Sequence, residues 1–179
     1  VMIFDNETEE WTESYLAFDN SYSPGDIDVD IEGEKTLTGR TLADEEFEFN
    51  LFASTASGTE GTLLDTVKNI GGGFTFERTF TEAGTYYYLV KEEIGTLGGI
   101  SYDLTEYLVK IVISDNLAGA LVLTSLDVMI FDNETEEWTE SYLAFNNRYT
   151  PPTVLVPDIE VKKSVAEEIF SEAGDELHY

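Results

Sequence analysis

The 179-residue sequence contains no cysteine, only 4 prolines, and only 9 basic residues against 37 acidic ones. Without cysteine, neither a disulfide nor a thiolate metal site can form. The formal net charge of −28 repels nucleic acid and anionic membranes, because binding to phosphates requires clustered lysine and arginine. No apolar run approaches the ~20 residues of a membrane-spanning helix. We therefore expect neither nucleic acid nor a membrane as a partner.

The sequence does contain enough apolar residues for a folded core, since 42% are hydrophobic and 13% aromatic. Segments of alternating, β-branched and aromatic residues follow one another, separated by turn signals such as SPGD, SGTEG, EAG and DNETEE. This pattern predicts an all-β sandwich with short hairpins. The expected strands cover residues 27–37, 47–54, 62–67, 73–80, 84–93, 102–114, 119–132 and 138–149.

One segment occurs twice, because residues 1–18 recur letter for letter as residues 128–145. The match continues more loosely, with DNSYSP at 19–24 against NNRYTP at 146–151. A repeat of this length at domain-sized spacing indicates tandem domains.

The repeat predicts the domain boundaries, because its second copy would close one domain and its first copy the domain before. We expect residues 1–24 to be the closing hairpin of a preceding repeat domain and residues 25–151 to be a complete domain. Residues 152–157 would be an extended linker, and residues 158–179 the opening strands of a following surface-repeat domain.

Alternation along the strands places three polar side chains inside the complete domain. The odd-numbered positions that precede Lys35 in its strand are apolar or glycine, which puts Lys35 on the inner face. Asn147 shares a face with Phe145, and Glu92 shares a face with Val90. Alternation alone leaves two interpretations open: a buried group of three, or separate side chains whose polar ends reach the solvent.

Five short motifs then match a known family in its order. They are K-x-L-x-G-R-x-L at 35–42, F-x-F-x-L at 47–51, G-T-Y-x-Y-x-V-x-E at 84–92, G-I-x-Y-D at 99–103 and F-x-N-x-Y-x-P at 145–151. With them, residues 25–151 resemble the isopeptide-linked domains of Gram-positive major pilins and adhesin repeats, the CnaB-like streptococcal pilin isopeptide linkage domains. The resemblance implies an immunoglobulin-like β-sandwich with an intramolecular isopeptide bond and no cofactor.

The resemblance also implies roles for the three inward residues. Lys35 and Asn147 would form the cross-link and Glu92 would be its catalytic acid, although the doubled Glu92-Glu93 departs from the family pattern. Burial would lower the pKa of the Lys35 amine and raise the pKa of Glu92. The neutral amine could then attack the Asn147 carbonyl while protonated Glu92 polarises that carbonyl and carries protons to the departing ammonia. The expected walls of this pocket are Phe47, Phe49, Phe76, Tyr88 and Tyr107.

By the same resemblance, the chain would be a structural stalk module of an extracellular pilus, fibre or wall-attached adhesin. Its partners would be neighbouring repeat domains or subunits of the same fibre. The alternative is a ligand-binding adhesin domain that recognises glycan or host protein through loop tyrosines and tryptophans. Short loops favour the stalk. A turnover enzyme is the least favoured class, since no nucleophile motif is present.

Four further residues have candidate roles. Asn20 corresponds to Asn147 and would be cross-linked to the preceding domain, or to a neighbouring chain by strand exchange through residues 1–24. Lys163 would be the reactive lysine of the following domain. Asn6 and Asn133 occupy glycosylation sequons.

Two acidic clusters are candidates for calcium binding, Asp26/Asp28/Asp30 and Asp132/Glu134/Glu136. Neither matches an EF-hand, and we expect no metal site.

Overall fold

The computed structural model describes residues 1–13, 19–132 and 134–153, and in these residues the regular structure is β-strand. The strands are β1 Met2–Asp5, β2 Glu10–Glu13, β3 Ile27–Thr38, β4 Glu48–Ser54, β5 Glu60–Lys68, β6 Gly73–Phe80, β7 Gly84–Glu92, β8 Ile100–Ser101, β9 Glu106–Asp115, β10 Leu121–Asp132, β11 Glu137–Glu140 and β12 Ala144–Tyr149. No helix in this described part is long and apolar enough to span a membrane.

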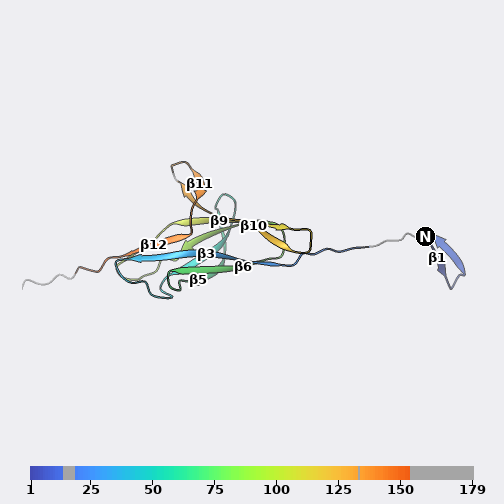
Figure 1. Cartoon of the computed structure of the whole chain (residues 1–179), viewed down its shortest axis with the longest axis horizontal. Helices are drawn as coiled ribbons and strands as arrows, with labels where there is room; N and C mark the ends of the chain where they lie inside the picture. The colour runs from blue at the N-terminus through green and yellow to red at the C-terminus, as the bar shows by residue number, and fades with distance from the viewer. Residues whose placement is uncertain (14–18, 133, 154–179) are drawn as a thin grey trace, which may run out of the picture.

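Two sheets pack face to face and form a sandwich (Figure 1). One sheet has six strands in the order β11-β10-β9-β7-β4-β5, and the other has four in the order β6-β3-β12-β8. Strands β1 and β2 form a two-stranded sheet of their own. The structure confirms the all-β sandwich that the strand pattern predicts.

The core lies between the two sheets and follows the alternation of the sequence. Ile31 of β3, Phe49 of β4 and Phe145 of β12 have no exposed surface, and burial of each such side chain contributes ~1.5–3 kcal/mol. The ring of Phe74 stacks on that of Phe49 with 3.8 Å between centroids. Phe74 fits because Gly33 has no side chain: a Cβ there would lie 2.2 Å from the Phe74 ring. The pairing of β3 with β6 continues through Gly33 without a register shift, so the alternation that places Lys35 inside is preserved.

The strand expected at 138–149 is in fact two strands in different sheets. β11 pairs with β10 in the six-stranded sheet, and β12 pairs with β3 in the four-stranded one. The chain crosses between them at 141–143, where Leu143 is buried. The segment 102–105, also expected to be strand, is irregular. The first difference arises because β12 must reach the partner sheet to lie beside β3. The second arises because 102–105 connects β8 in the four-stranded sheet to β9 in the six-stranded one.

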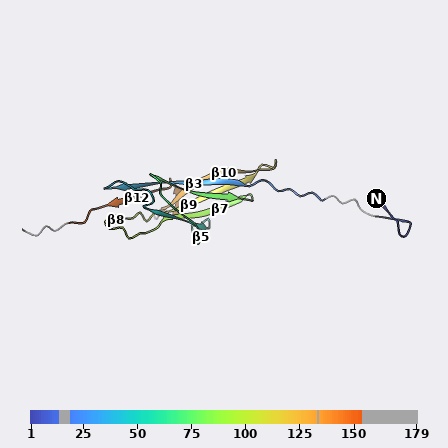
Figure 2. The ribbon, with the colours of Figure 1, turned by 90° about the horizontal axis from the view of Figure 1, so that it is seen from below.

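β12 and β3 are parallel neighbours, with Phe145 opposite Lys35 and Asn147 opposite Leu37. The chain therefore enters and leaves the sandwich at opposite ends, as both views show (Figure 2). We call the entry end, with Gly25 and the β9–β10 turn, the opening pole. The exit end, with Tyr149 and β8, is the closing pole. The twelve residues of β3 span about 40 Å between them.

Candidate functional site

Lys35, Glu92 and Asn147 meet inside the sandwich. β3 and β12 supply Lys35 and Asn147 from one sheet, and β7 supplies Glu92 from the facing sheet. Their exposed fractions are 1%, 7% and 1%, so all three are buried, as the alternation predicts. The interpretation as three separate side chains that reach the solvent is therefore wrong.

The carboxyl group of Glu92 bridges the other two side chains. Lys35 Nζ lies 2.6 Å from Glu92 Oε2, and Asn147 Nδ2 donates to Glu92 Oε1 over 2.5 Å. Glu93 is exposed and accepts instead from Asn50 Nδ2 at 2.8 Å. Of the doubled acid, Glu92 is thus the residue that reaches the buried lysine.

Aromatic rings enclose the lysine. Lys35 Nζ lies 4.5 Å from the centroid of Phe47 and 5.9 Å from that of Phe49. Tyr107 contacts Phe145 edge to face at 5.1 Å and donates its hydroxyl to the Ala144 carbonyl at 2.6 Å. Two expected wall residues belong to the core farther along the sandwich: Phe76 is opposite Ile31 and Tyr88 is opposite Ala53.

Burial shifts both ionisable groups toward their neutral forms. Loss of water around the amine lowers the pKa of Lys35, although its hydrogen bond to Glu92 opposes the shift. The same desolvation raises the pKa of Glu92, against the hydrogen bonds from Lys35 and Asn147. The two pKa values therefore approach each other, and moving the shared proton from Lys35 to Glu92 becomes easier than in water.

Asp103 is the residue that sequence reasoning missed. Its backbone N–H donates to Asn147 Oδ1 at 2.8 Å, and its carboxylate accepts from the Asn146 N–H at 2.7 Å and the Thr105 hydroxyl at 2.6 Å. Burial alone would raise the pKa of Asp103, but these hydrogen bonds lower it below its usual value. The residue is the last letter of the G-I-x-Y-D motif, which was the available signal.

The arrangement surrounds one carboxamide with what amide exchange requires. An amine and the carboxamide nitrogen share one carboxyl group, and a backbone N–H holds the carboxamide oxygen. This differs from the expectation that Glu92 would polarise the Asn147 carbonyl. Glu92 contacts the nitrogen, and Asp103 N–H has the position from which charge on the oxygen is stabilised.

The other candidate residues do not join this group. Asn20 is exposed, outside the sandwich core, and Asn6 lies in the exposed turn between β1 and β2. Asn133 and Lys163 lie outside the described residues. Within the described ranges, no three acidic or histidine side chains are placed to hold a metal ion.

One carboxylate of each acidic cluster accepts local hydrogen bonds. Asp28 Oδ1 accepts from the Thr79 hydroxyl at 2.6 Å, and Asp132 Oδ1 accepts from the Glu134 N–H at 2.8 Å. These contacts give both aspartates a structural role.

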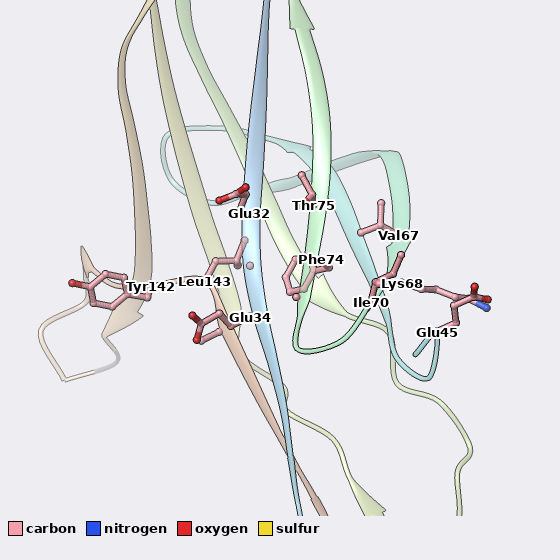
Figure 3. A pocket seen from close by; sticks show the side chains of 13 residues that line it. Glu32, Glu34, Glu45, Val67, Lys68, Ile70, Phe74, Thr75, Tyr142 and Leu143 are labelled. Carbon is pink, nitrogen blue, oxygen red and sulfur yellow. The ribbon is translucent and has the colours of Figure 1, made fainter. Parts of the chain in front are cut away.

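A groove of about 1090 Å³ opens elsewhere on the sandwich (Figure 3). Figure 3 shows Glu32 and Glu34 of β3 between Tyr142 on one side and Phe74 on the other. Lys68 lies on the far rim, and none of the three buried cross-linking candidates lines the groove. The groove is therefore separate from the Lys35 site.

Residues 31–150 match the family model for the FctA, Spy0128-like isopeptide-containing domain. The chain belongs to this family. The family match covers the three buried polar residues and Asp103, and with the sandwich it makes the chain a pilin-like isopeptide-containing domain. No curated protein is significantly similar to the chain.

Solved structures of major pilins from Streptococcus pyogenes are similar at low identity. One major pilin is 21% identical with a TM-score of 0.46, covering 73% of this chain and 51% of that one. The T3.2 pilin is 18% identical with a TM-score of 0.47, over 67% of this chain and 52% of that one. The T-13 pilin is 15% identical with a TM-score of 0.47, over 71% and 55%. This chain spans about half the length of these pilins.

Proposed function

We propose that the chain is a structural module of an extracellular surface fibre, closed by an isopeptide bond between Lys35 and Asn147 that Glu92 promotes. The observation that carries this proposal is the position of the Glu92 carboxyl group, within hydrogen-bonding distance of both the Lys35 amine and the Asn147 amide nitrogen. A buried ion pair alone would leave the asparagine without a role. The bond forms once per molecule, so no substrate is turned over.

The reaction begins when the Lys35 ammonium gives a proton to Glu92. The neutral amine attacks Asn147 Cγ, and the oxyanion that forms accepts the hydrogen bond of Asp103 N–H. Glu92 then passes its proton to the Asn147 nitrogen and takes one from the attacking nitrogen. The carbon–nitrogen bond of the carboxamide breaks, ammonia leaves, and an amide joins the two side chains. The fold supplies the high effective concentration that this slow exchange needs.

The cross-link would stabilise the domain in two ways. It closes a loop of roughly 110 residues, and by analogy with a disulfide this contributes about 4–5 kcal/mol. It also joins parallel neighbours whose free ends lie at opposite poles. Tension applied through Gly25 and Pro151 would pass through the covalent bond before it sheared the hydrogen bonds between β3 and β12.

The repeat extends the proposal to neighbouring modules. Residues 1–24 would close a preceding domain and residues 25–151 form this one, followed by the linker at 152–157 and a further domain that contains Lys163. Asn20 would be cross-linked inside that preceding domain, or to a neighbouring chain by strand exchange. The S. pyogenes relatives are major pilins, which supports a cell-surface location and partners within the same fibre.

Intact mass spectrometry tests the proposal directly. We expect wild type to be lighter than its sequence mass by one ammonia, and Lys35→Ala and Glu92→Ala to show their full sequence masses. Lys110→Ala is the matched control, because Lys110 pairs with Asp127 on the outer face and should leave the ammonia loss unchanged. A folded wild type with its full sequence mass would refute the proposal.

A further inference from the structure

Tyr22 connects the segment that enters the sandwich to the β9–β10 turn. Its hydroxyl donates to Asp115 Oδ1 at 2.8 Å and accepts from the Gly119 N–H at 3.1 Å. Beside it, Gly25 N–H donates to Gly119 O at 2.9 Å, and Leu121 N–H donates to Gly25 O at 3.2 Å. The path of the chain into the opening pole is therefore fixed by the turn, although Tyr22 itself is largely exposed.

The repeat aligns Tyr22 with Tyr149 at the closing pole. The Tyr149 ring lies 5.2 Å from the Arg40 guanidinium carbon. Its backbone is close to Gly39, where a Cβ would lie 2.2 Å from Tyr149 O, and the next N–H donates to Gly99 O at 2.8 Å. Tyr149 thus has a defined seat at the end of its own domain. If residues 1–24 close a domain of the same kind, as proposed above, the Tyr22 ring has the equivalent seat there.

We propose that Tyr22 is a shared anchor between consecutive domains, its ring seated on the closing pole of the preceding domain and its hydroxyl bound to the β9–β10 turn of the following one. The partner that fits the opening pole is thus a second domain of this kind. Only Ser23 and Pro24 separate Tyr22 from Gly25, and the fixed φ of proline restricts this connection. The joint is stiff as a result.

Exposed apolar side chains at both poles support this docking. Leu117, at the tip of the β9–β10 turn, is 84% exposed and has a φ of 57°, a conformation that is uncommon for leucine. Asp115 Oδ1 holds it there by accepting the Leu117 N–H at 2.7 Å, with the same oxygen that binds Tyr22. Ile94 and Leu97, between β7 and β8 near the closing pole, are also exposed. Contact between these groups would remove apolar surface from water at the joint.

Hydrogen exchange on the present chain tests the hydroxyl contact. We expect the Gly119 amide to exchange roughly five- to tenfold faster in Tyr22→Phe, because the acceptor of that N–H is removed. Tyr142→Phe, which changes another exposed tyrosine, should leave Gly119 unchanged. Equal exchange at Gly119 in wild type and Tyr22→Phe would overturn the anchor.

A two-domain chain tests the joint. Placing residues 25–127 before Val1 rebuilds a preceding domain, because residues 1–24 supply its closing segment. Since the chain has no cysteine, Glu77→Cys in both domains gives two spin-label sites on an exposed face of β6. We expect the distances between the two spin labels to be narrowly distributed in the wild type. The width of this distribution should roughly double in Tyr22→Phe and in Leu117→Ser, because the two domains would then be joined flexibly. A wild type as broad as these variants would refute the stiff joint.

The same two-domain chain separates this proposal from the cross-link. Its intact mass should show the loss of two ammonia molecules, one from each domain. The full sequence mass together with a narrow distance distribution would refute the isopeptide proposal and leave the joint standing. Two ammonia losses with a broad distance distribution would refute the stiff joint and leave the isopeptide proposal standing.

Discussion

The same local sequence forms the same hairpin in two different surroundings. Met2 pairs with Glu13 in the first copy as Met129 pairs with Glu140 in the second. The turns also agree, because Glu9 and Glu136 have φ values of 55° and 57°. Hairpin formation, register and turn are therefore properties of the repeated segment itself.

Burial is what differs between the copies. Ile3 is 54% exposed and Trp11 is 62% exposed. Ile130 packs against the core because β10 pairs with β9, and Trp138 is half-buried over Gly58. The hairpin is therefore encoded by its own sequence, whereas its contribution to stability depends on partners distant in the sequence. Paired substitutions in the two copies can test this separation.

The largest contrast is expected between the two equivalent asparagines. Asn147→Ala should abolish the ammonia loss and lower the free energy of unfolding by about 4–5 kcal/mol, because the cross-linked loop is opened. Asn20→Ala should keep the ammonia loss and change stability by less than about 0.5 kcal/mol, as for an exposed position. Calorimetry with intact mass checks both, and equal melting of the two variants would contradict the assignment of Asn147.

A smaller contrast is expected between the two equivalent isoleucines. Ile130→Ala removes a half-buried side chain from beside the core and should cost about 1–2 kcal/mol. Ile3→Ala should cost close to nothing in the sandwich transition, since Ile3 lies in the separate two-stranded sheet. Urea unfolding monitored by near-UV circular dichroism measures the difference. A similar loss in both would mean that the first hairpin also packs on the sandwich.

Trp138 packs over Gly58, whereas its counterpart Trp11 is exposed. Gly58 has a φ of 77°, and a Cβ there would lie 2.2 Å from Trp138. Gly58→Ala should therefore cost about 1–2 kcal/mol from strain and displacement of the indole ring. The cost should shrink when Trp138→Ala is added and persist when Trp11→Ala is added. A double-mutant cycle from chemical unfolding checks this, and the opposite pattern would rule out the contact.

The smallest expected effect is on the pH dependence of stability, through the aspartates in the two hairpin turns. The Glu134 N–H lowers the pKa of Asp132 below 3.8, and the Glu7 N–H does the same to Asp5. Because the folded-state pKa is lowered, the stabilisation from Asp132 is present above pH 3.8 and is lost as the pH falls through the folded-state value. Asp132→Asn should make the stability of the sandwich less sensitive to acid in this window, while Asp5→Asn should not. Thermal melts between pH 2 and pH 5 would show it; identical acid profiles in wild type and Asp132→Asn would contradict it.

Alternation was sufficient to predict much of this molecule. It gave the sandwich, most strand positions, and the burial of Lys35, Glu92 and Asn147, because a side chain's face depends only on its parity within a regular strand. The family match supported the sandwich and the resemblance, whereas the cross-link and the domain boundaries stay predictions.

The parts that could not be predicted depend on distant or backbone partners. Alternation gives the face on which a side chain lies but not the sheet that a strand joins. The crossing of the chain from β11 to β12 therefore could not be predicted from residues 138–149. The donor to Asn147 Oδ1 is the main-chain N–H of Asp103. Every residue except proline has such a group, so the residue type does not indicate which one binds. The Glu92 contact with nitrogen depends on which side of the carboxamide faces β7, which no pattern of residue types encodes.

The buried position of Glu92 has a consequence for the finished domain. If the Lys35 amine becomes an amide as proposed, the carboxyl group loses the one cation that contacts it in the described part of the chain, while the desolvation that raises its pKa remains. It should then stay a neutral acid and donate a permanent hydrogen bond to the new linkage. In the proposed reaction, Glu92 would therefore transfer protons once and afterwards serve as a structural hydrogen-bond donor in the core.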